Sequence, residues 1–103
     1  MTKYHAVPTV VDGIRFASKG EAGRYKELKL MERSGTIACL ELQPRYPLVV
    51  NGVKVGEYRA DFRYTEIGAG VIVEDFKGVR TPVYRLKRLL VRALYGIEIR
   101  ETS

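Results

Sequence analysis

The sequence predicts an α/β domain of the mixed α+β kind, in which a central mixed β-sheet is flanked by helices. Three observations carry this prediction. Residues 36–77 are rich in apolar and β-branched side chains and are interrupted by turn residues, which is typical of strands. Two segments around them repeat apolar residues at helical spacing. The length of 103 residues fits one domain, so we expect a single domain over residues 1–103.

A β-hairpin is predicted near the N-terminus. Residues 10–11 and 14–16 are mainly apolar and flank Asp12-Gly13. An Asp-Gly pair readily takes the positive φ angles that a two-residue hairpin turn requires. The sequence therefore predicts two short strands joined by a tight turn.

A helix is predicted directly after this hairpin. Ser18 is a good N-cap, and Glu21 three residues later completes a capping-box pattern. Ser34-Gly35 is expected to end the helix. The apolar side chains at helical spacing are Tyr25, Leu28 and Met31.

Three strands are predicted in the middle of the chain. The first covers Ile37–Val50, with Pro44 and Pro47 marking breaks or an edge. Asn51-Gly52 turns the chain into the second, Val53–Thr65. A turn over residues 67–70 leads into the third, Val71–Lys77. Because side chains alternate along a strand, the two faces of the second strand should differ. One face carries Tyr58, Ala60, Phe62 and Tyr64, and the other carries Arg59, Asp61 and Arg63.

A second helix is predicted from Pro82 to about Tyr95, because proline suits a first helical turn and Gly96 suits its end. A short last strand is expected over Ile97–Arg100. The helical stripe that we expect to be buried consists of Val83, Leu86, Leu89, Leu90, Ala93 and Leu94. A basic ridge on another face consists of Arg85, Arg88 and Arg92.

The charge pattern suggests a polyanionic partner. The net charge is +6, and the basic excess lies in the two ends of the chain, whereas residues 35–78 are slightly acidic. Basic ends can bind nucleic acid while an acidic middle holds metal ions, although a solvated basic surface gives the same balance. Cys39 is the only cysteine, so an internal disulfide is excluded. No apolar run approaches the roughly 20 residues of a membrane span, so we expect a cytoplasmic protein without a membrane partner.

One group of residues carries a recognisable chemistry. Asp75 and Lys77 share a face of the third strand, and Asp61 comes close to Asp75 if the second and third strands pair. Carboxylate oxygens are the ligands that Mg²⁺ prefers, and a bound metal activates water for phosphodiester hydrolysis. Lys77 would orient that water or stabilise the transition state. His5 is the only histidine, so a nucleophile–histidine pair is not expected.

Asp61, thirteen residues, and then Asp75-Phe76-Lys77 resemble the D-X(n)-(D/E)-X-K signature of PD-(D/E)XK nucleases. The wider pattern resembles a family of small phage-encoded proteins placed in that superfamily. The resembling stretches are residues 3–6, 10–19, 40–44, 58–62, 73–78 and 81–87. The resemblance implies a restriction-endonuclease-like core, a Mg²⁺ or Mn²⁺ cofactor, hydrolysis of DNA, and a place in the host-cell cytoplasm. It also implies a relation to phage enzymes that resolve Holliday junctions.

The same resemblance assigns roles to residues of this chain. Asp61, Asp75 and Lys77 match the three catalytic positions, and the two aspartates match the metal ligands. Glu21 matches an acid on the first helix that also ligates metal in many members, although it has a second reading as a capping-box residue. Two positions depart from the signature: Ala60 replaces its proline, and Asp75 replaces the more frequent glutamate. Glu74 faces the other side of a regular strand and ranks below Asp75.

DNA is the expected partner, bound mainly through its phosphates. So small a chain has little surface for reading a base sequence, which favours recognition of branched DNA or simple nicking, by a homodimer. The candidate DNA-contacting residues are Arg85, Arg88, Arg92, Lys87, Arg80, Lys19 and Gln43, the last by resemblance only.

Two alternatives stay open at this point. The chain has a second reading as a non-catalytic nucleic-acid-binding accessory protein that keeps a nuclease-like fold. RNA is also a possible substrate, because the catalytic residues make no use of the 2′-hydroxyl.

Overall fold

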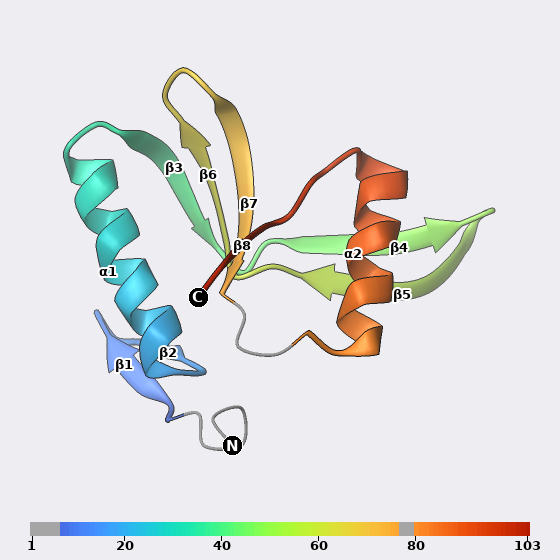
Figure 1. Cartoon of the computed structure of the whole chain (residues 1–103), viewed down its shortest axis with the longest axis horizontal. Helices are drawn as coiled ribbons and strands as arrows, with labels where there is room; N and C mark the ends of the chain where they lie inside the picture. The colour runs from blue at the N-terminus through green and yellow to red at the C-terminus, as the bar shows by residue number, and fades with distance from the viewer. Residues whose placement is uncertain (1–6, 77–79) are drawn as a thin grey trace.

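A four-stranded mixed sheet forms the centre of the computed structural model, which describes residues 7–76 and 80–103 (Figure 1). It contains β3 (Ile37–Leu42), β6 (Phe62–Glu66), β7 (Gly70–Phe76) and β8 (Arg100–Thr102), in the spatial order β3-β6-β7-β8. The first two pairings are antiparallel, and β8 runs parallel to β7. The predicted fold class, a mixed sheet with helices on its flanks, is confirmed.

The N-terminal elements form as the sequence predicts. β1 (Thr9–Val11) and β2 (Ile14–Phe16) pair through a turn in which Asp12 and Gly13 have φ angles of 53° and 74°. Helix α1 (Lys19–Arg33) begins at Ser18, whose hydroxyl accepts a hydrogen bond from the Glu21 amide at 3.1 Å. Helix α1 then lies along β3 at one side of the sheet (Figure 1).

A bend divides the two long predicted strands. β4 (Arg45–Val50) and β5 (Val53–Arg59) form a separate ribbon that projects from the sheet (Figure 1). Two backbone hydrogen bonds connect the ribbon to the β3–β6 pair, from Gln43 N to Asp61 O at 2.9 Å and from Ala60 N to Pro44 O at 3.1 Å. Residues 37–66 are therefore one long hairpin that bends at positions 43–44 and 60–61.

The bend creates two separate hydrophobic clusters. The first joins α1, the N-terminal hairpin and the sheet, and its buried members are Phe16, Ala22, Tyr25, Leu28, Ile37, Phe62 and Tyr64. The second joins the ribbon, helix α2 (Pro82–Tyr95), β7 and the segment before β8, and its buried members are Tyr46, Leu48, Tyr58, Ala60, Val73, Tyr84, Val91 and Ile99. Side chains predicted on one strand face therefore pack in two cores: Tyr58 and Ala60 in the second, Phe62 and Tyr64 in the first.

Helix α2 has the predicted limits but not the predicted buried face. Pro82 lies in its first turn, and Gly96, with φ of 69°, ends it. Tyr84 and Val91 are its buried residues, and they face the ribbon. Of the predicted stripe, Leu90 packs against the second cluster, whereas the other members are exposed, so the prediction is wrong for Val83, Leu86, Leu89, Ala93 and Leu94. The last strand, expected over Ile97–Arg100, forms at Arg100–Thr102, where it pairs with the end of β7.

A glycine in the first turn of α1 allows this helix to approach β7 closely. A Cβ atom added at Gly20 would fall inside the van der Waals surface of the Phe76 ring, whereas one added at Gly23 would meet no atom within 4 Å. Both glycines lie in the same helix, so their intrinsic cost to helix formation is similar.

We predict opposite effects of alanine at these two positions. Gly23→Ala should raise the free energy of unfolding by about 0.5–1 kcal/mol, because alanine restricts the unfolded chain and favours the helix. Gly20→Ala should lower it by about 1–2 kcal/mol, because the helix or the Phe76 ring must move. Urea unfolding of both variants and the wild type measures this. Equal stabilisation by both substitutions would contradict a close approach of α1 to β7.

Candidate functional site

Asp61 and Asp75 lie together where the ribbon meets the sheet. Asp61 occupies the bend between β5 and β6, and Asp75 is the next-to-last residue of β7. The backbone amide of Asp61 donates to Asp75 Oδ1 at 2.9 Å, and Asp61 Oδ2 accepts from the Phe76 amide at 2.7 Å. Asp61 is therefore held by an amide of β7, and Asp75 is held by an amide of the bend, which fixes both side chains in place.

Asp75 is held on its other side by a tyrosine. The Tyr58 hydroxyl donates a hydrogen bond to Asp75 Oδ2. Asp75 is 1% exposed and Tyr58 is 3% exposed. Burial and the neighbouring Asp75 charge raise the pKa of Tyr58 well above its usual range, so this hydroxyl remains a donor. Asp75 is thus a buried carboxylate whose two oxygen atoms both accept hydrogen bonds.

The neighbouring negative charges of this site act on the Asp61 carboxyl. Burial, the Asp75 charge and the Glu21 charge together raise the pKa of Asp61 from 3.8 to about 7. Glu21 reaches the site from the first turn of α1 and is 7% exposed. The structure therefore brings together three of the residues singled out in the sequence, Glu21, Asp61 and Asp75, as a cluster of like charges.

The adjacent acid of β7 serves a structural purpose. Glu74 is fully buried and accepts two hydrogen bonds from Arg24, from Nε at 2.6 Å and from Nη2 at 2.8 Å. The Tyr64 hydroxyl donates a further bond at 2.6 Å. Glu74 is thus neutralised by an arginine of α1, on the opposite side of β7 from Asp75.

The donor set of the cluster suits a hard divalent cation. Among residues 7–76 and 80–103, no three His, Cys, Asp or Glu side chains stand in a ready metal-ligating arrangement. The chemistry nevertheless fits, because carboxylates that repel one another in a buried site are stabilised by a cation such as Mg²⁺. The residues that would hold it are Asp61, Asp75 and Glu21. Lys77, the third residue of the signature, lies outside the described residues, as does His5.

In the predicted basic ridge of α2, Arg85 and Arg92 are exposed, Arg88 is half-buried, and two of the three are ion-paired. Arg85, Arg88 and Arg92 line a shallow depression together with Leu89 and Glu98. Arg88 pairs with Glu101 at 3.4 Å, and Arg92 pairs with Glu98 at 3.1 Å. For Arg85 and Lys87, no ion pair is found within the described part of the chain.

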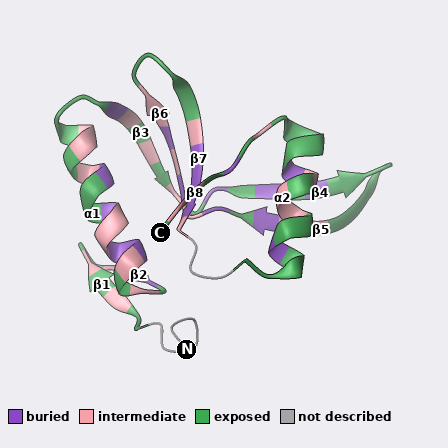
Figure 2. Ribbon diagram, in the orientation of Figure 1, coloured by how far each residue is buried: buried purple, intermediate pink, exposed green. Residues whose placement is uncertain are grey.

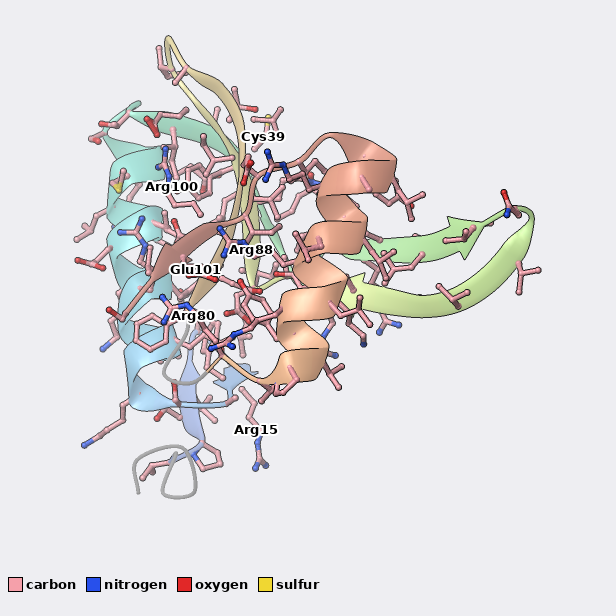
Figure 3. All side chains as sticks on the ribbon, turned by 45° about the vertical axis from the view of Figure 1, so that its right-hand side comes forward. Arg15, Cys39, Arg80, Arg88, Arg100 and Glu101 are labelled. Atoms are coloured by element: carbon pink, nitrogen blue, oxygen red, sulfur yellow. The ribbon has the colours of Figure 1, made fainter. Side chains whose placement is uncertain are left out.

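Glu101 connects the basic residues to the carboxylate site. It lies beside Asp75 in the β7–β8 register and binds Arg80 at 2.7 Å as well as Arg88, and Figure 3 shows both arginines around it. The Tyr84 hydroxyl donates to Glu101 at 2.7 Å, and the Tyr84 ring packs against Tyr58, which binds Asp75. Arg80 and Arg88 are therefore held one strand away from Asp75.

The two remaining candidates lie apart from this ridge. Lys19 is an exposed residue of the first turn of α1, two positions before Glu21. Gln43 is exposed at the bend, with φ of 53°, and its amide binds the carbonyl oxygen of Asp61. Lys19 thus lies on the helix that carries Glu21, and Gln43 lies opposite Asp61 across the bent hairpin.

Sequence reasoning missed the residues that hold the acids in place. Tyr58 was assigned only to one face of the second predicted strand, and Arg24 and Glu101 were not singled out. A tyrosine hydroxyl buried on an inner strand needs a hydrogen-bond partner, and that need is the one signal that points to Tyr58 from the sequence. No comparable local signal exists for Arg24, which lies 50 positions before Glu74 in the chain.

The fold and the site define a small mixed α/β protein with paired aspartates where a bent hairpin meets a sheet. The chain belongs to the DUF1064 family, since the family model described as "Protein of unknown function (DUF1064)" matches residues 1–102. No curated protein and no solved structure matches the chain. Among the described residues, neither helix is long and apolar enough to cross a membrane.

The raised pKa of Asp61 predicts how stability depends on pH. A carboxyl whose pKa is raised by folding contributes stability that is fully present below about pH 4 and is lost as the pH rises through about 7. Asp61→Asn removes this loss and keeps an acceptor for the Phe76 amide. The variant should therefore match the wild type near pH 4 and exceed it at pH 8.5 by on the order of 2 kcal/mol.

Urea unfolding at pH 4, 6 and 8.5 in EDTA measures this difference. Glu27→Gln is the matched control, because Glu27 is an exposed acid of α1 that takes part in a 3.5 Å pair with Arg24. Its stability difference from the wild type should stay small across this range. An Asp61→Asn variant whose advantage does not grow with pH would show that the site carries no excess negative charge.

Proposed function

We propose that this protein is a metal-dependent endonuclease of the PD-(D/E)XK type that hydrolyses DNA phosphodiester bonds. The observation that carries the proposal is the pair of interlocked aspartates with Glu21 close by. A chain does not benefit from burying three like charges for stability alone, since each pays a desolvation cost. Such clusters are typical of sites that bind a cation or carry out acid–base chemistry.

In this proposal, each residue of the site has a separate role. A bound Mg²⁺ or Mn²⁺ would supply a nucleophilic water and neutralise charge on the phosphate. Asp61, Asp75 and Glu21 hold the cation, and the Tyr58 hydroxyl and the Asp61 amide orient the Asp75 carboxylate. Lys77 follows Asp75 by two residues and acts on the attacking water or the phosphate, as its place in the signature implies.

DNA is the proposed substrate, with recognition of backbone shape rather than base sequence. The net charge of +6 favours a polyanion. Arg85 and Lys87 are charged groups of α2 available to phosphates, and Arg80 and Arg88 lie one strand from Asp75. Contacts of this kind position a protein on nucleic acid without reading its bases. Branched DNA, including the Holliday junction, and nicking of duplex DNA are therefore the activities to test.

Cleavage by wild type and by Asp75→Asn tests the catalytic proposal. Asparagine keeps the shape of the side chain, an acceptor for the Asp61 amide and a group for Tyr58, so the variant should fold. We expect the wild type to cut supercoiled plasmid or a synthetic four-way junction with Mg²⁺ or Mn²⁺ and not with EDTA. Asp75→Asn should lose at least about 100-fold in rate, since it removes a charge from the proposed metal site.

Asp12→Asn is the matched control for this experiment. Asp12 is the only aspartate outside the site, and it accepts a hydrogen bond from Tyr25 at the N-terminal hairpin. Its activity should remain close to that of the wild type. If neither DNA is cut while junction binding is intact in both proteins, the chain is a nucleic-acid-binding accessory protein. Cleavage of a matched RNA junction instead would assign RNA as the substrate.

Arg85→Ala tests the proposed phosphate contacts of α2. The variant should bind the four-way junction more weakly, and the slope of log K against log salt should fall by about 0.9 if one phosphate contact is lost. Fluorescence anisotropy over a salt series measures both quantities. Arg33→Ala is the control, because Arg33 is an exposed arginine in the last turn of α1. An equal effect of the two substitutions would mean that α2 makes no specific contact.

A further inference from the structure

Glu101 carries a negative charge among basic residues, and the proposed function gives it no role. Its two oxygen atoms are divided among three donors. Oε1 accepts a hydrogen bond from Arg80 Nε at 2.7 Å. Oε2 accepts one from the Tyr84 hydroxyl at 2.7 Å and lies 3.4 Å from Arg88 Nη1. The bond from Tyr84 and the two arginines hold the pKa of Glu101 below its usual range, so this side chain is ionised at neutral pH.

This arrangement differs from an ordinary surface ion pair. The side chains of Arg92 and Glu98 are 64% and 63% exposed, and a pair of that kind contributes little because water screens it. The Glu101 side chain is only 14% exposed, and Figure 2 shows β8 as half-buried and most of α2 as exposed. A carboxylate in this place has a desolvation cost and also repels phosphate. It is therefore unfavourable for DNA binding unless it improves the placement of the arginines.

Both arginines keep donors for a further partner. The side chains of Arg80 and Arg88 are 49% and 41% exposed, so solvent reaches each of them. Arg80 uses Nε and Arg88 uses Nη1, and no hydrogen bond of their other nitrogen atoms is found within residues 7–76 and 80–103. Guanidinium groups bind phosphate through two such donors in parallel. An arginine whose rotamer is already fixed loses less conformational entropy in doing so.

The two arginines are held next to the carboxylate site. Glu101 is the register partner of Asp75, and paired strands lie about 4.8 Å apart. Tyr58 binds Asp75, Tyr84 binds Glu101, and the centroids of the two tyrosine rings are 6.4 Å apart. Both carboxylates therefore face the same side of the sheet, and Figure 3 shows the two arginines around Glu101.

We infer that Glu101 is a positioning residue, which holds Arg80 and Arg88 beside the carboxylate site so that their remaining N–H groups bind a phosphate of the DNA. The inference rests on the proposed function through its DNA partner and not through cleavage. In this arrangement a negative charge of the protein strengthens the binding of a polyanion. Without positioning, the same charge weakens that binding.

Glu101→Gln separates these two cases. Glutamine keeps an acceptor for the Tyr84 hydroxyl, so the variant should fold, which near-ultraviolet circular dichroism checks. Fluorescence anisotropy of a four-way junction in EDTA, over a salt series, measures binding by the full chain. We expect about 10-fold weaker binding than for the wild type. The slope of log K against log salt should fall by about 0.9 for each phosphate contact that is lost.

The same substitution should have the opposite effect when both arginines are absent. In a background that carries Arg80→Ala and Arg88→Ala, Glu101→Gln removes only a charge that repels phosphate, so it should tighten binding. This reversal of sign is the coupling that a double-mutant cycle detects. A residue that only stabilises β8 would change binding in the same direction in both backgrounds.

Glu66→Gln is the matched control. Glu66 is another strand glutamate that pairs with an arginine, Arg100, at 3.1 Å. Its register partner is Gly70, five residues from Asp75 on β7 and thus about 17 Å away along the strand. The control removes the same charge, so junction binding should stay the same or become slightly tighter.

Cleavage kinetics with Mg²⁺ give a second readout. Arginines that bind a phosphate equally in the substrate and in the transition state affect KM, so Glu101→Gln should raise KM about 10-fold and leave kcat within about 2-fold. A kcat that falls at unchanged KM would show that Glu101 only supports Asp75. Binding by Glu101→Gln as tight as that of the wild type would show that the arginines need no positioning. Either result overturns the inference and leaves the proposed nuclease intact.

Failure of the proposed function gives a different result. If the wild type binds the junction without cutting it, the nuclease proposal fails, and weaker binding by Glu101→Gln still supports the inference. A wild type that binds no junction, with or without Mg²⁺, overturns both.

Discussion

The structure depends on the reciprocal hydrogen bonds between Asp61 and the end of β7. Asp61 lies at the bend of a long hairpin, where the ladder passes from β3–β6 to β4–β5. Its amide binds Asp75 and its carboxylate binds the Phe76 amide, so β7 holds the bend from one side. Together with the backbone hydrogen bonds at positions 43–44 and 60–61, this contact fixes the direction in which the ribbon leaves the sheet. The two hydrophobic clusters, the position of α2 on the ribbon and the carboxylate site all follow from that direction.

Features of this fold with a local cause could be predicted from the sequence. The turns at Asp12-Gly13 and Asn51-Gly52 take positive φ angles that Asp, Asn and Gly tolerate, and Ser18 caps α1 through an amide three residues away. That Asp61 and Asp75 lie close together could also be predicted, because the short turn between β6 and β7 limits the register in which these strands can pair. Each of these features is set by residues that are near neighbours along the chain or across one turn.

The features that were mispredicted or missed depend on contacts between distant residues. Hydrophobic periodicity indicates that α2 has an apolar stripe, but it does not say what the stripe faces. The ribbon offers α2 a narrow contact, and Tyr84 occupies it because its ring meets Tyr58 while its hydroxyl reaches Glu101. Leu86 and Leu89 are then left outside. The bend at positions 60–61 also has no local signal in the sequence, because the side chains from Tyr58 to Tyr64 alternate in polarity as they would in a straight strand.

The two adjacent acids of β7, Glu74 and Asp75, lie in opposite electrostatic surroundings. Glu74 points toward α1, where Arg24 neutralises it with two hydrogen bonds, as a fully buried charge requires. Asp75 points the other way and receives hydrogen bonds from Tyr58 and from a backbone amide. The excess negative charge then raises the pKa of Asp61. The fold thus neutralises one buried acid of β7 with an arginine, and it leaves excess negative charge beside the other, where we propose that a metal ion binds.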